Sequence, residues 1–147
     1  MTESTTEDLR IERVFDAPRE LVFNAWLDPD QLSGWYGPEG YTVPRESVIV
    51  EPREGGRWEL AMVPGEGGGE HPLRSEIVEL VEPSLIVIEN EAIPDHGIGV
   101  TRTRVELHDE DGKTRLVLID GPYEQRMGEM AGMGWNGAFD KLAVIIA

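Results

Sequence analysis

The last part of the chain limits the possible folds most strongly, because it combines helical periodicity with considerable length. Over residues 124–146 apolar side chains recur on one side, namely Ala131, Trp135, Ala138, Phe139, Leu142 and Ile146. Gln125, Glu129, Asn136 and Asp140 fall on the other side. This pattern predicts an amphipathic helix that buries one stripe. At ~1.5 Å per residue it spans on the order of 34 Å, enough to lie across an entire sheet.

The segment before this helix has a period of two instead. Between residues 42 and 121 apolar and polar residues alternate, and Gly, Pro and Asp interrupt the alternation at intervals. This is typical of an antiparallel meander. We predict strands at residues 43–51, 57–63, 73–81, 85–93, 100–108 and 114–120. The last two are joined by a stretch ending in Asp111-Gly112, which is a hairpin signal.

The N-terminal part predicts one strand and two short helices. Residues 9–15 alternate as a strand does, and Asp16, Pro18 and Glu20 mark a helix start. Asp28-Pro29 ends this helix and begins another, which stops before Gly37-Pro38. We expect residues 1–8 to form a flexible tail and residues 9–147 a single domain. The order of elements predicts an α+β fold whose long helix covers one face of a curved antiparallel sheet.

Composition excludes several classes of protein. With 39% hydrophobic and 29% charged residues among 147, the chain is composed like a folded globular domain. It contains no Cys, which rules out disulfides, thiolate metal sites and cysteine nucleophiles. A net charge of −16 argues against nucleic acid or an anionic membrane as a partner, and its simplest interpretation is solubility. The first ten residues lack signal-peptide features, so we expect a cytoplasmic, non-membrane protein.

The sequence predicts no catalytic residue, cofactor or metal. Glycines at residues 132–137 match a dinucleotide-binding spacing but lack the preceding strand and the later acidic residue. The glycine-rich stretch 65–70 has no Lys-Ser/Thr pair and carries two carboxylates. His71, His96 and His108 do not show metal-ligand spacing.

Glycines and methionines in the terminal helix have two interpretations. Gly128, Gly132, Gly134 and Gly137 each cost the helix up to ~1 kcal/mol relative to Ala. They permit either close approach to the sheet or room for a bound molecule. The neighbouring methionines suit an adaptable binding surface and an ordinary core equally well; they are Met127, Met130 and Met133.

Four charged residues on neighbouring strands also have two interpretations. One hairpin register would place Glu91 opposite Arg102 and Glu89 opposite Arg104. On the solvent face these would be weak cross-strand ion pairs. On the inner face they would form a polar clamp for a ligand.

Several segments resemble a known family by their order along the chain. They are Phe15-Asp16-Ala17-Pro18-Arg19-Glu20, Ala25-Trp26, Asp28-Pro29, Trp35-Tyr36-Gly37-Pro38, Glu51-Pro52-Arg53-Glu54-Gly55-Gly56-Arg57-Trp58, Thr114-Arg115-Leu116 and Gly134-Trp135. From about Leu9 onward the chain resembles homologues of the heat-shock-protein-90 ATPase activator, in the START-like superfamily, also called SRPBCC or birch-pollen-allergen-like. The resemblance implies a helix-grip fold: an antiparallel sheet of about six or seven strands wraps a long C-terminal helix and leaves a cavity between them.

Three functional hypotheses follow from the residues and the resemblance. The leading one is binding of a small apolar or aromatic molecule between the sheet and the terminal helix. The candidate binding residues, each of which could equally pack in the core, are Trp35, Trp58, Met62, Met127, Met130, Ala131 and Trp135.

The other hypotheses belong to different classes. The second hypothesis is a protein-interaction module that stimulates a chaperone ATPase. The negative charge of the chain would then be complementary to a basic surface on the chaperone. An enzyme of cyclase or hydrolase type would need a buried carboxylate, such as Asp120 or Glu76. The sequence leaves the oligomeric state open, a homodimer included.

Overall fold

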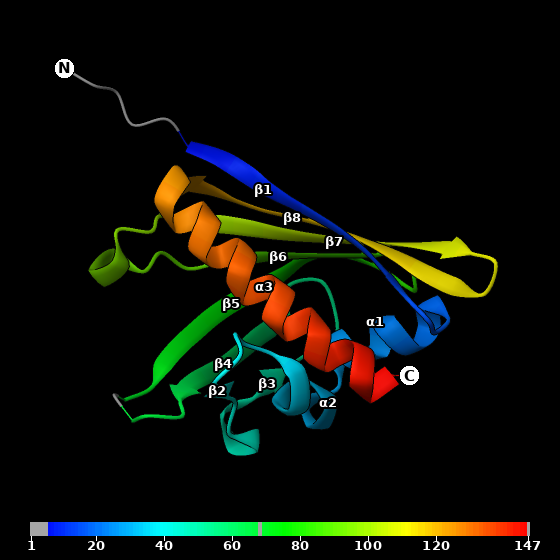
Figure 1. Ribbon diagram of the computed structural model, residues 1–147, viewed down its shortest axis with the longest axis horizontal. Coiled ribbons are helices and arrows are strands. Elements are labelled where there is room, and N and C mark those ends of the chain that lie inside the picture. Colours follow the sequence, from blue (N-terminus) through cyan, green and yellow to red (C-terminus); the bar gives the residue numbers. More distant parts are fainter. Residues whose placement is uncertain (1–5, 68, 147) are drawn as a thin grey trace.

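The computed structural model describes residues 6–67 and 69–146 as one antiparallel sheet with helices packed against it (Figure 1). The α-helices are α1 (Arg19–Leu27), α2 (Pro29–Trp35) and α3 (Gln125–Ile146), and the short 3-10 helices are η1 (Arg45–Ser47) and η2 (Pro94–His96). The strands are β1 (Thr6–Phe15), β2 (Tyr41–Thr42), β3 (Ile49–Val50), β4 (Arg57–Pro64), β5 (His71–Val81), β6 (Leu85–Asn90), β7 (Thr101–Glu110) and β8 (Lys113–Glu124). The α+β helix-grip prediction is confirmed.

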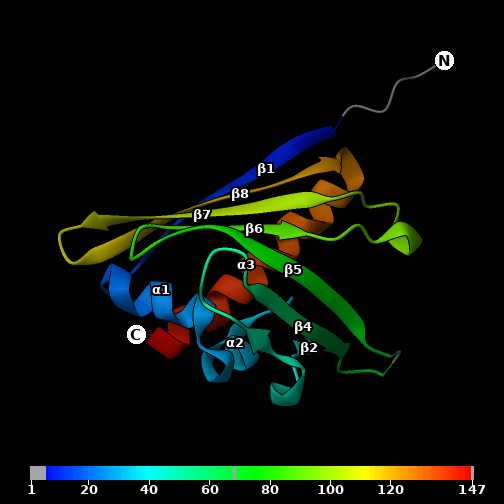
Figure 2. The ribbon, with the colours of Figure 1, turned by 180° about the vertical axis from the view of Figure 1, so that it is seen from behind.

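The strand order places the first strand beside the last one. It runs β1-β8-β7-β6-β5-β4-β2, with β3 also paired to β4. Viewed from behind, the sheet is strongly twisted, and α3 crosses its opposite face (Figure 2). β1 starts at Thr6, which pairs with Glu124 of β8. Residues 6–8, predicted as part of a flexible tail, therefore belong to a strand, because pairing with β8 satisfies their backbone groups. Residues 1–5 of that tail lie outside the described residues.

The strand predicted at residues 43–51 is wrong, because η1 interrupts it between β2 and β3. Pro44 has no backbone N–H to donate to a neighbouring strand. The Ser47 hydroxyl donates to the Pro44 carbonyl at 2.7 Å and accepts from the Ala61 N–H at 3.1 Å. Local side-chain bonds of this kind compete with a continuous ladder. The described residues therefore contain eight strands, two of them only two residues long, which agrees with the expected sheet of about six or seven strands.

The hairpin predicted between the last two strands is confirmed. Glu110 of β7 pairs with Lys113 of β8, which leaves Asp111 and Gly112 as the turn. Their φ angles are 54° and 87°. A two-residue turn with positive φ at both positions matches the twist of the flanking strands, and Asp-Gly accepts it at little cost.

The four charged residues face solvent, with Glu89 in β6, Glu91 directly after it, and Arg102 and Arg104 in β7. Glu89 pairs with Arg102, and Arg104 lies opposite Val87, so the register differs by two residues from the predicted one. The shift arises because β6 ends at Asn90, and the following loop closes on itself through an Ile93–Ile98 bridge. An Arg102 nitrogen lies 2.9 Å from a Glu89 carboxylate oxygen, with the side chains 61% and 41% exposed. The inward polar clamp is therefore excluded.

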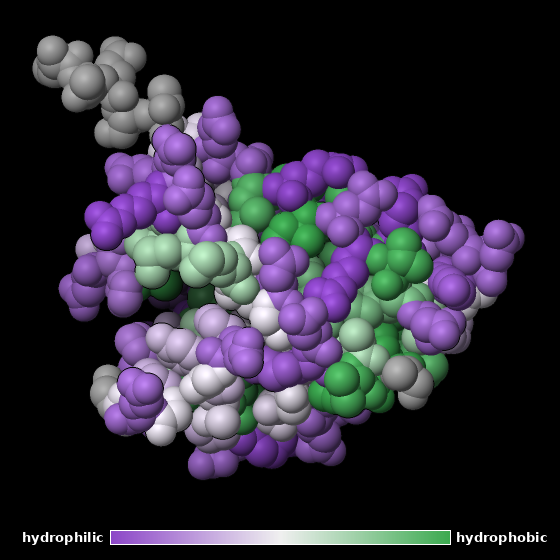
Figure 3. All heavy atoms as spheres, in the orientation of Figure 1, coloured by the Kyte–Doolittle hydropathy of each residue, from purple (hydrophilic) through white to green (hydrophobic). Residues whose placement is uncertain are grey.

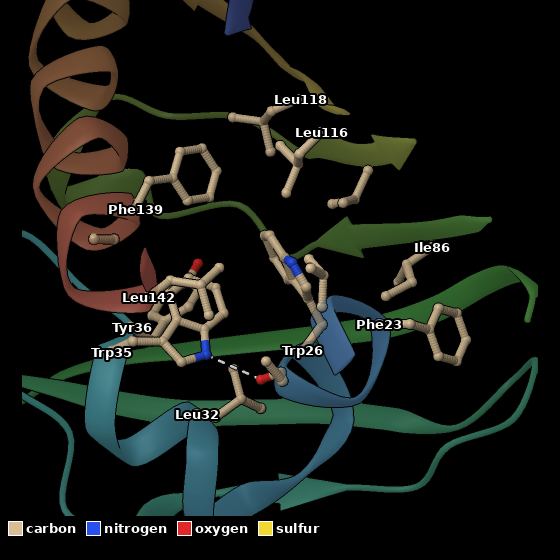
Figure 4. Close-up of a cluster of buried hydrophobic side chains, with 14 of the residues drawn as sticks. Phe23, Trp26, Leu32, Trp35, Tyr36, Ile86, Leu116, Leu118, Phe139 and Leu142 are labelled. Atoms are coloured by element: carbon tan, nitrogen blue, oxygen red, sulfur yellow. Dashed lines mark hydrogen bonds between the residues drawn. The ribbon is translucent and has the colours of Figure 1, made fainter. Parts of the chain in front are cut away.

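The hydrophobic core is built around aromatic rings from the helices and β4. Trp26, Trp35 and Phe139 are fully buried where α1, α2 and the second half of α3 meet the sheet (Figure 4). The indole N–H of Trp35 donates to the Ala25 carbonyl at 2.9 Å, and that of Trp58 donates to the Trp26 carbonyl at 2.9 Å.

No helix among residues 6–67 and 69–146 is long and apolar enough to cross a membrane.

The two halves of α3 differ in how they meet the sheet. Its fully buried residues, Ala138, Phe139 and Leu142, all lie in the C-terminal half. In the N-terminal half, residues 125–137, every side chain keeps some exposure. The first half of α3 is therefore less completely buried than the second half, which seals the core.

Candidate functional site

A small cavity lies beside the N-terminal half of α3. Its volume is about 160 Å³, and its walls come from α3, from the segment after α2, and from β4. The lining residues are Tyr36, Gly37, Pro38, Met62, Met130, Ala131, Gly134, Trp135 and Ala138. Apart from the Tyr36 hydroxyl and the Trp135 N–H, their side chains are apolar, so the cavity suits a small molecule with an apolar body.

Two glycines set the distance between α3 and the segment that follows α2. A Cβ built on Gly134 would lie 3.3 Å from the Pro38 Cγ, and one on Gly137 would lie 3.0 Å from the Glu39 nitrogen. The close-approach interpretation therefore holds at these positions, although the neighbour is residues 38–39 and not the sheet. Gly132 makes no such approach, since its Cβ would meet the Leu9 Cδ1 at 3.7 Å.

A second, larger hollow of about 520 Å³ adjoins the start of α3. It extends from Tyr123 and Met127 to the loop of residues 96–100, and it shares Met130 with the small cavity. Met130 lines both spaces and therefore lies between them. Its flexible side chain is 57% exposed. The space-filling view shows the surface hollowed beneath the beginning of α3 (Figure 3).

The seven candidate binding residues separate into three groups in the structure. Met62, Met130, Ala131 and Trp135 line the small cavity. Met127 lines the adjoining hollow. Trp35 and Trp58 line neither space, because their indoles lie in the core with their N–H groups bonded to backbone carbonyls.

Tyr36 was not among the sequence candidates, yet it forms one wall of the cavity. Its ring centroid lies 5.5 Å from that of Trp135, with the planes at 86°. Burial, and then the negative charge of Asp120, raise the pKa of Tyr36 above its ordinary value. Among residues 6–67 and 69–146 its hydroxyl has no hydrogen-bond partner within the protein. It can therefore donate to or accept from a molecule in the cavity.

A buried polar network crosses the inner face of the sheet, and sequence reasoning found only one of its members, Asp120. The Ser75 hydroxyl donates to the Asn90 side-chain oxygen at 2.6 Å. The Asn90 amide donates to the hydroxyls of Thr101 and Thr103 at 3.1 and 3.0 Å. The Thr103 hydroxyl donates to an Asp120 oxygen at 2.8 Å. The only feature of the sequence that could predict these residues is the alternation along β5 to β8, which places them on the inner face of the sheet.

Asp120 connects the network to the cavity wall. It is 2% exposed, and its second oxygen accepts from the Tyr123 hydroxyl at 2.8 Å and from the Trp135 N–H at 2.9 Å. Burial raises the pKa of this carboxyl, while the bonds from Trp135, Tyr123 and Thr103 oppose the shift. Glu76, the other carboxylate considered for catalysis, is exposed, so its predicted burial is wrong.

The histidines and acidic residues do not assemble a metal centre in the described part of the chain, where no group of three or more potential ligands is close enough. His71 and His96 do approach each other, with ring centroids 6.0 Å apart. Sequence spacing did not predict this approach, which depends on the loop after β6 folding over the start of β5.

The family model "Activator of Hsp90 ATPase homolog 1-like protein" matches residues 16–147. The chain belongs to this family. No curated protein is similar to it in sequence at a significant level.

Solved structures agree with the fold. A protein from Chromobacterium violaceum superimposes with a TM-score of 0.86 at 24% identity, covering 95% of this chain and 96% of that one. The AHSA1 protein of Silicibacter pomeroyi gives 0.78 at 26% identity, covering 94% and 96%. CalU16 from Micromonospora echinospora gives 0.70 at 23% identity, covering 96% and 74%.

Proposed function

We propose that this protein binds a small aromatic or apolar molecule in the cavity beside the N-terminal half of α3. The observation that carries the proposal is the contrast within one helix. The second half of α3 seals a core, whereas the first half, with its glycines and methionines, borders open space. A helix that served only to close the fold would bury both halves.

The size and chemistry of the cavity limit the range of ligands that it can bind. An apolar protein cavity of about 150 Å³ binds benzene, and pockets for drug-sized ligands measure roughly 300–1,000 Å³. The cavity here, about 160 Å³, therefore fits one ring with a short substituent. The Tyr36 hydroxyl can form a hydrogen bond with a polar atom on that substituent. The flexible Met130 side chain can move so that a longer group extends into the adjoining hollow.

Toluene binding followed by NMR of the methionine methyl groups tests this proposal. We expect the methyl signals of Met62 and Met130, which line the cavity, to shift with saturation, and those of exposed Met133 to stay in place. Ala131→Phe places a ring in the cavity and should weaken toluene at least tenfold. Met133→Phe adds a ring to the same helix at a position 73% exposed, and should leave affinity unchanged. Equal toluene affinities of the Ala131→Phe and Met133→Phe variants would refute the proposal.

The family name supports a second candidate, stimulation of a chaperone ATPase. The net charge of −16 suits a basic surface on such a partner. We expect Ala131→Phe to retain any stimulation of Hsp90 ATP turnover, because the substitution fills the cavity and leaves the outer surface intact. An absence of stimulation by wild type at saturating concentration would exclude this candidate. The cytoplasm stays the predicted compartment.

A further inference from the structure

Asp120 is a buried carboxylate for which the described part of the chain provides no cation. The three groups that contact its oxygens are neutral: Thr103, Tyr123 and Trp135. The charge that acts on it most from nearby is that of Asp8, which is also negative. Buried charges in proteins are normally paired or bound to a metal, so an unpaired one beside a cavity needs an explanation.

The hydrogen bonds around Asp120 can satisfy both oxygens of its ionised form. Thr103 accepts from Asn90 and donates to Asp120, while Tyr123 and Trp135 both donate to its other oxygen. The Trp135 N–H is only a donor. A protonated carboxyl would instead donate its hydrogen to the Thr103 or Tyr123 hydroxyl, which would reverse that bond, whereas the Trp135 N–H donates in either case. The network thus concentrates donors around a negative charge without neutralising it.

This charge lies directly behind the aromatic wall of the cavity. The Trp135 indole lines the cavity with its ring and donates its N–H to Asp120 at 2.9 Å. Donation to an anion increases the electron density of the indole, whose face already attracts cations. Tyr36 supplies a second aromatic wall, nearly perpendicular to the first, and the charge of Asp120 reaches its hydroxyl.

The positive groups of this region do not face the small cavity. Lys141 directs its ammonium to the carbonyls of Tyr36 and Pro38, at 3.5 and 3.4 Å, and is not one of the lining residues. Arg126 and His96 line the adjoining hollow instead. A cation in the small cavity therefore contacts two aromatic rings and the thioethers of Met62 and Met130, and no positively charged residue of the described chain lines this cavity.

Building on the proposed function, we propose that the cavity is selective for a small organic cation, an aromatic or alkylated ammonium compound, held against Trp135 and Tyr36 and stabilised by the ionised Asp120 behind them. The apolar lining takes the body of the molecule, and the buried carboxylate provides the charge that the fold itself leaves uncompensated.

Toluene and N-methylpyridinium test this inference, because they have the same shape and differ in charge. We expect N-methylpyridinium to bind wild type at least as tightly as toluene, despite its stronger hydration. Asp120→Asn should lower the ratio of cation to toluene affinity about tenfold. Glu129→Gln is the matched control, since it removes one exposed carboxylate from α3 outside the cavity lining and should leave the ratio unchanged.

A measurement on wild type complements the variants should Asp120→Asn fail to fold. At 1 M salt the Debye length is about 3 Å, so a preference that arose from the overall negative surface would vanish, whereas one caused by a buried carboxylate persists. Equal affinity of Asp120→Asn and wild type for N-methylpyridinium, or loss of the preference at high salt, overturns the inference alone. Binding of neither compound overturns the proposed function as well.

Discussion

Two alanine substitutions in α3 separate helix propensity from close packing, because they make the same chemical change at two different contacts. Gly132→Ala adds a Cβ whose nearest neighbour is the Leu9 Cδ1 at 3.7 Å, an ordinary van der Waals distance. We expect it to stabilise the protein by about 0.5–1 kcal/mol, the gain of Ala over Gly inside a helix.

Gly137→Ala should lose this gain. Its Cβ would lie 3.0 Å from the Glu39 nitrogen and 3.5 Å from the Glu39 Cβ. The segment cannot retreat freely, because the Pro38 carbonyl accepts from the Tyr41 N–H at 3.0 Å and from the Lys141 ammonium at 3.4 Å. Overpacking costs about 1–3 kcal/mol, so this variant should be less stable than Gly132→Ala by about that amount.

Urea unfolding followed by tryptophan fluorescence measures both effects. With a slope of about 2 kcal/mol per molar urea, Gly132→Ala should raise the midpoint by roughly 0.25–0.5 M, and Gly137→Ala should leave it at or below that of wild type. Equal increases in the two midpoints would refute the argument that contact with residues 38–39 requires glycine at position 137.

Three further predictions concern single side chains. Because burial raises the pKa of Asp120 above its value of about 3.9 in the unfolded chain, its contribution to stability is full below that pH and is lost as pH rises through the folded-state pKa. The free energy of unfolding of wild type should accordingly fall relative to Asp120→Asn from about pH 4 towards neutral, and a difference independent of pH would contradict this. Thr114→Val breaks a fully buried 2.7 Å bond to the Ala17 carbonyl and should cost about 1 kcal/mol by urea unfolding, whereas exposed Thr42→Val should cost little. Arg102→Ala should change stability by less than about 1 kcal/mol, since its ion pair with Glu89 is exposed to solvent; a larger loss in thermal unfolding would contradict the assignment to the outer face.

Local patterns predicted most of the elements correctly. Alternation in β1, the Asp-Gly turn between β7 and β8, and the stripe of α3 each depend on residues adjacent in sequence. The prediction of a strand at residues 43–51 failed for the opposite reason, because one of the Ser47 bonds that favour η1 involves Ala61, on a different strand.

The site residues were predicted less completely, because cavity lining and core packing require the same residue types. Met62 and Trp58 both lie on β4 and point inward, yet only Met62 borders the cavity. Sequence alone does not identify Tyr36, because nothing in its neighbours along the chain distinguishes a ring that lines a cavity from one that fills a core.

The sequence by itself determined the fold class, since the hydrophobic periods, the turn residues and the length of the terminal helix are local properties that leave few ways to bury one face of a sheet. Only the tertiary structure decided where space remains and which charge borders it. Ser75, Asn90, Thr103, Asp120 and Trp135 come from four strands and a helix, and their hydrogen bonds exist only after the sheet has paired and α3 has crossed it. The physical reason is that a cavity and its electrostatic character depend on contacts between distant residues, which no local spacing along the chain encodes.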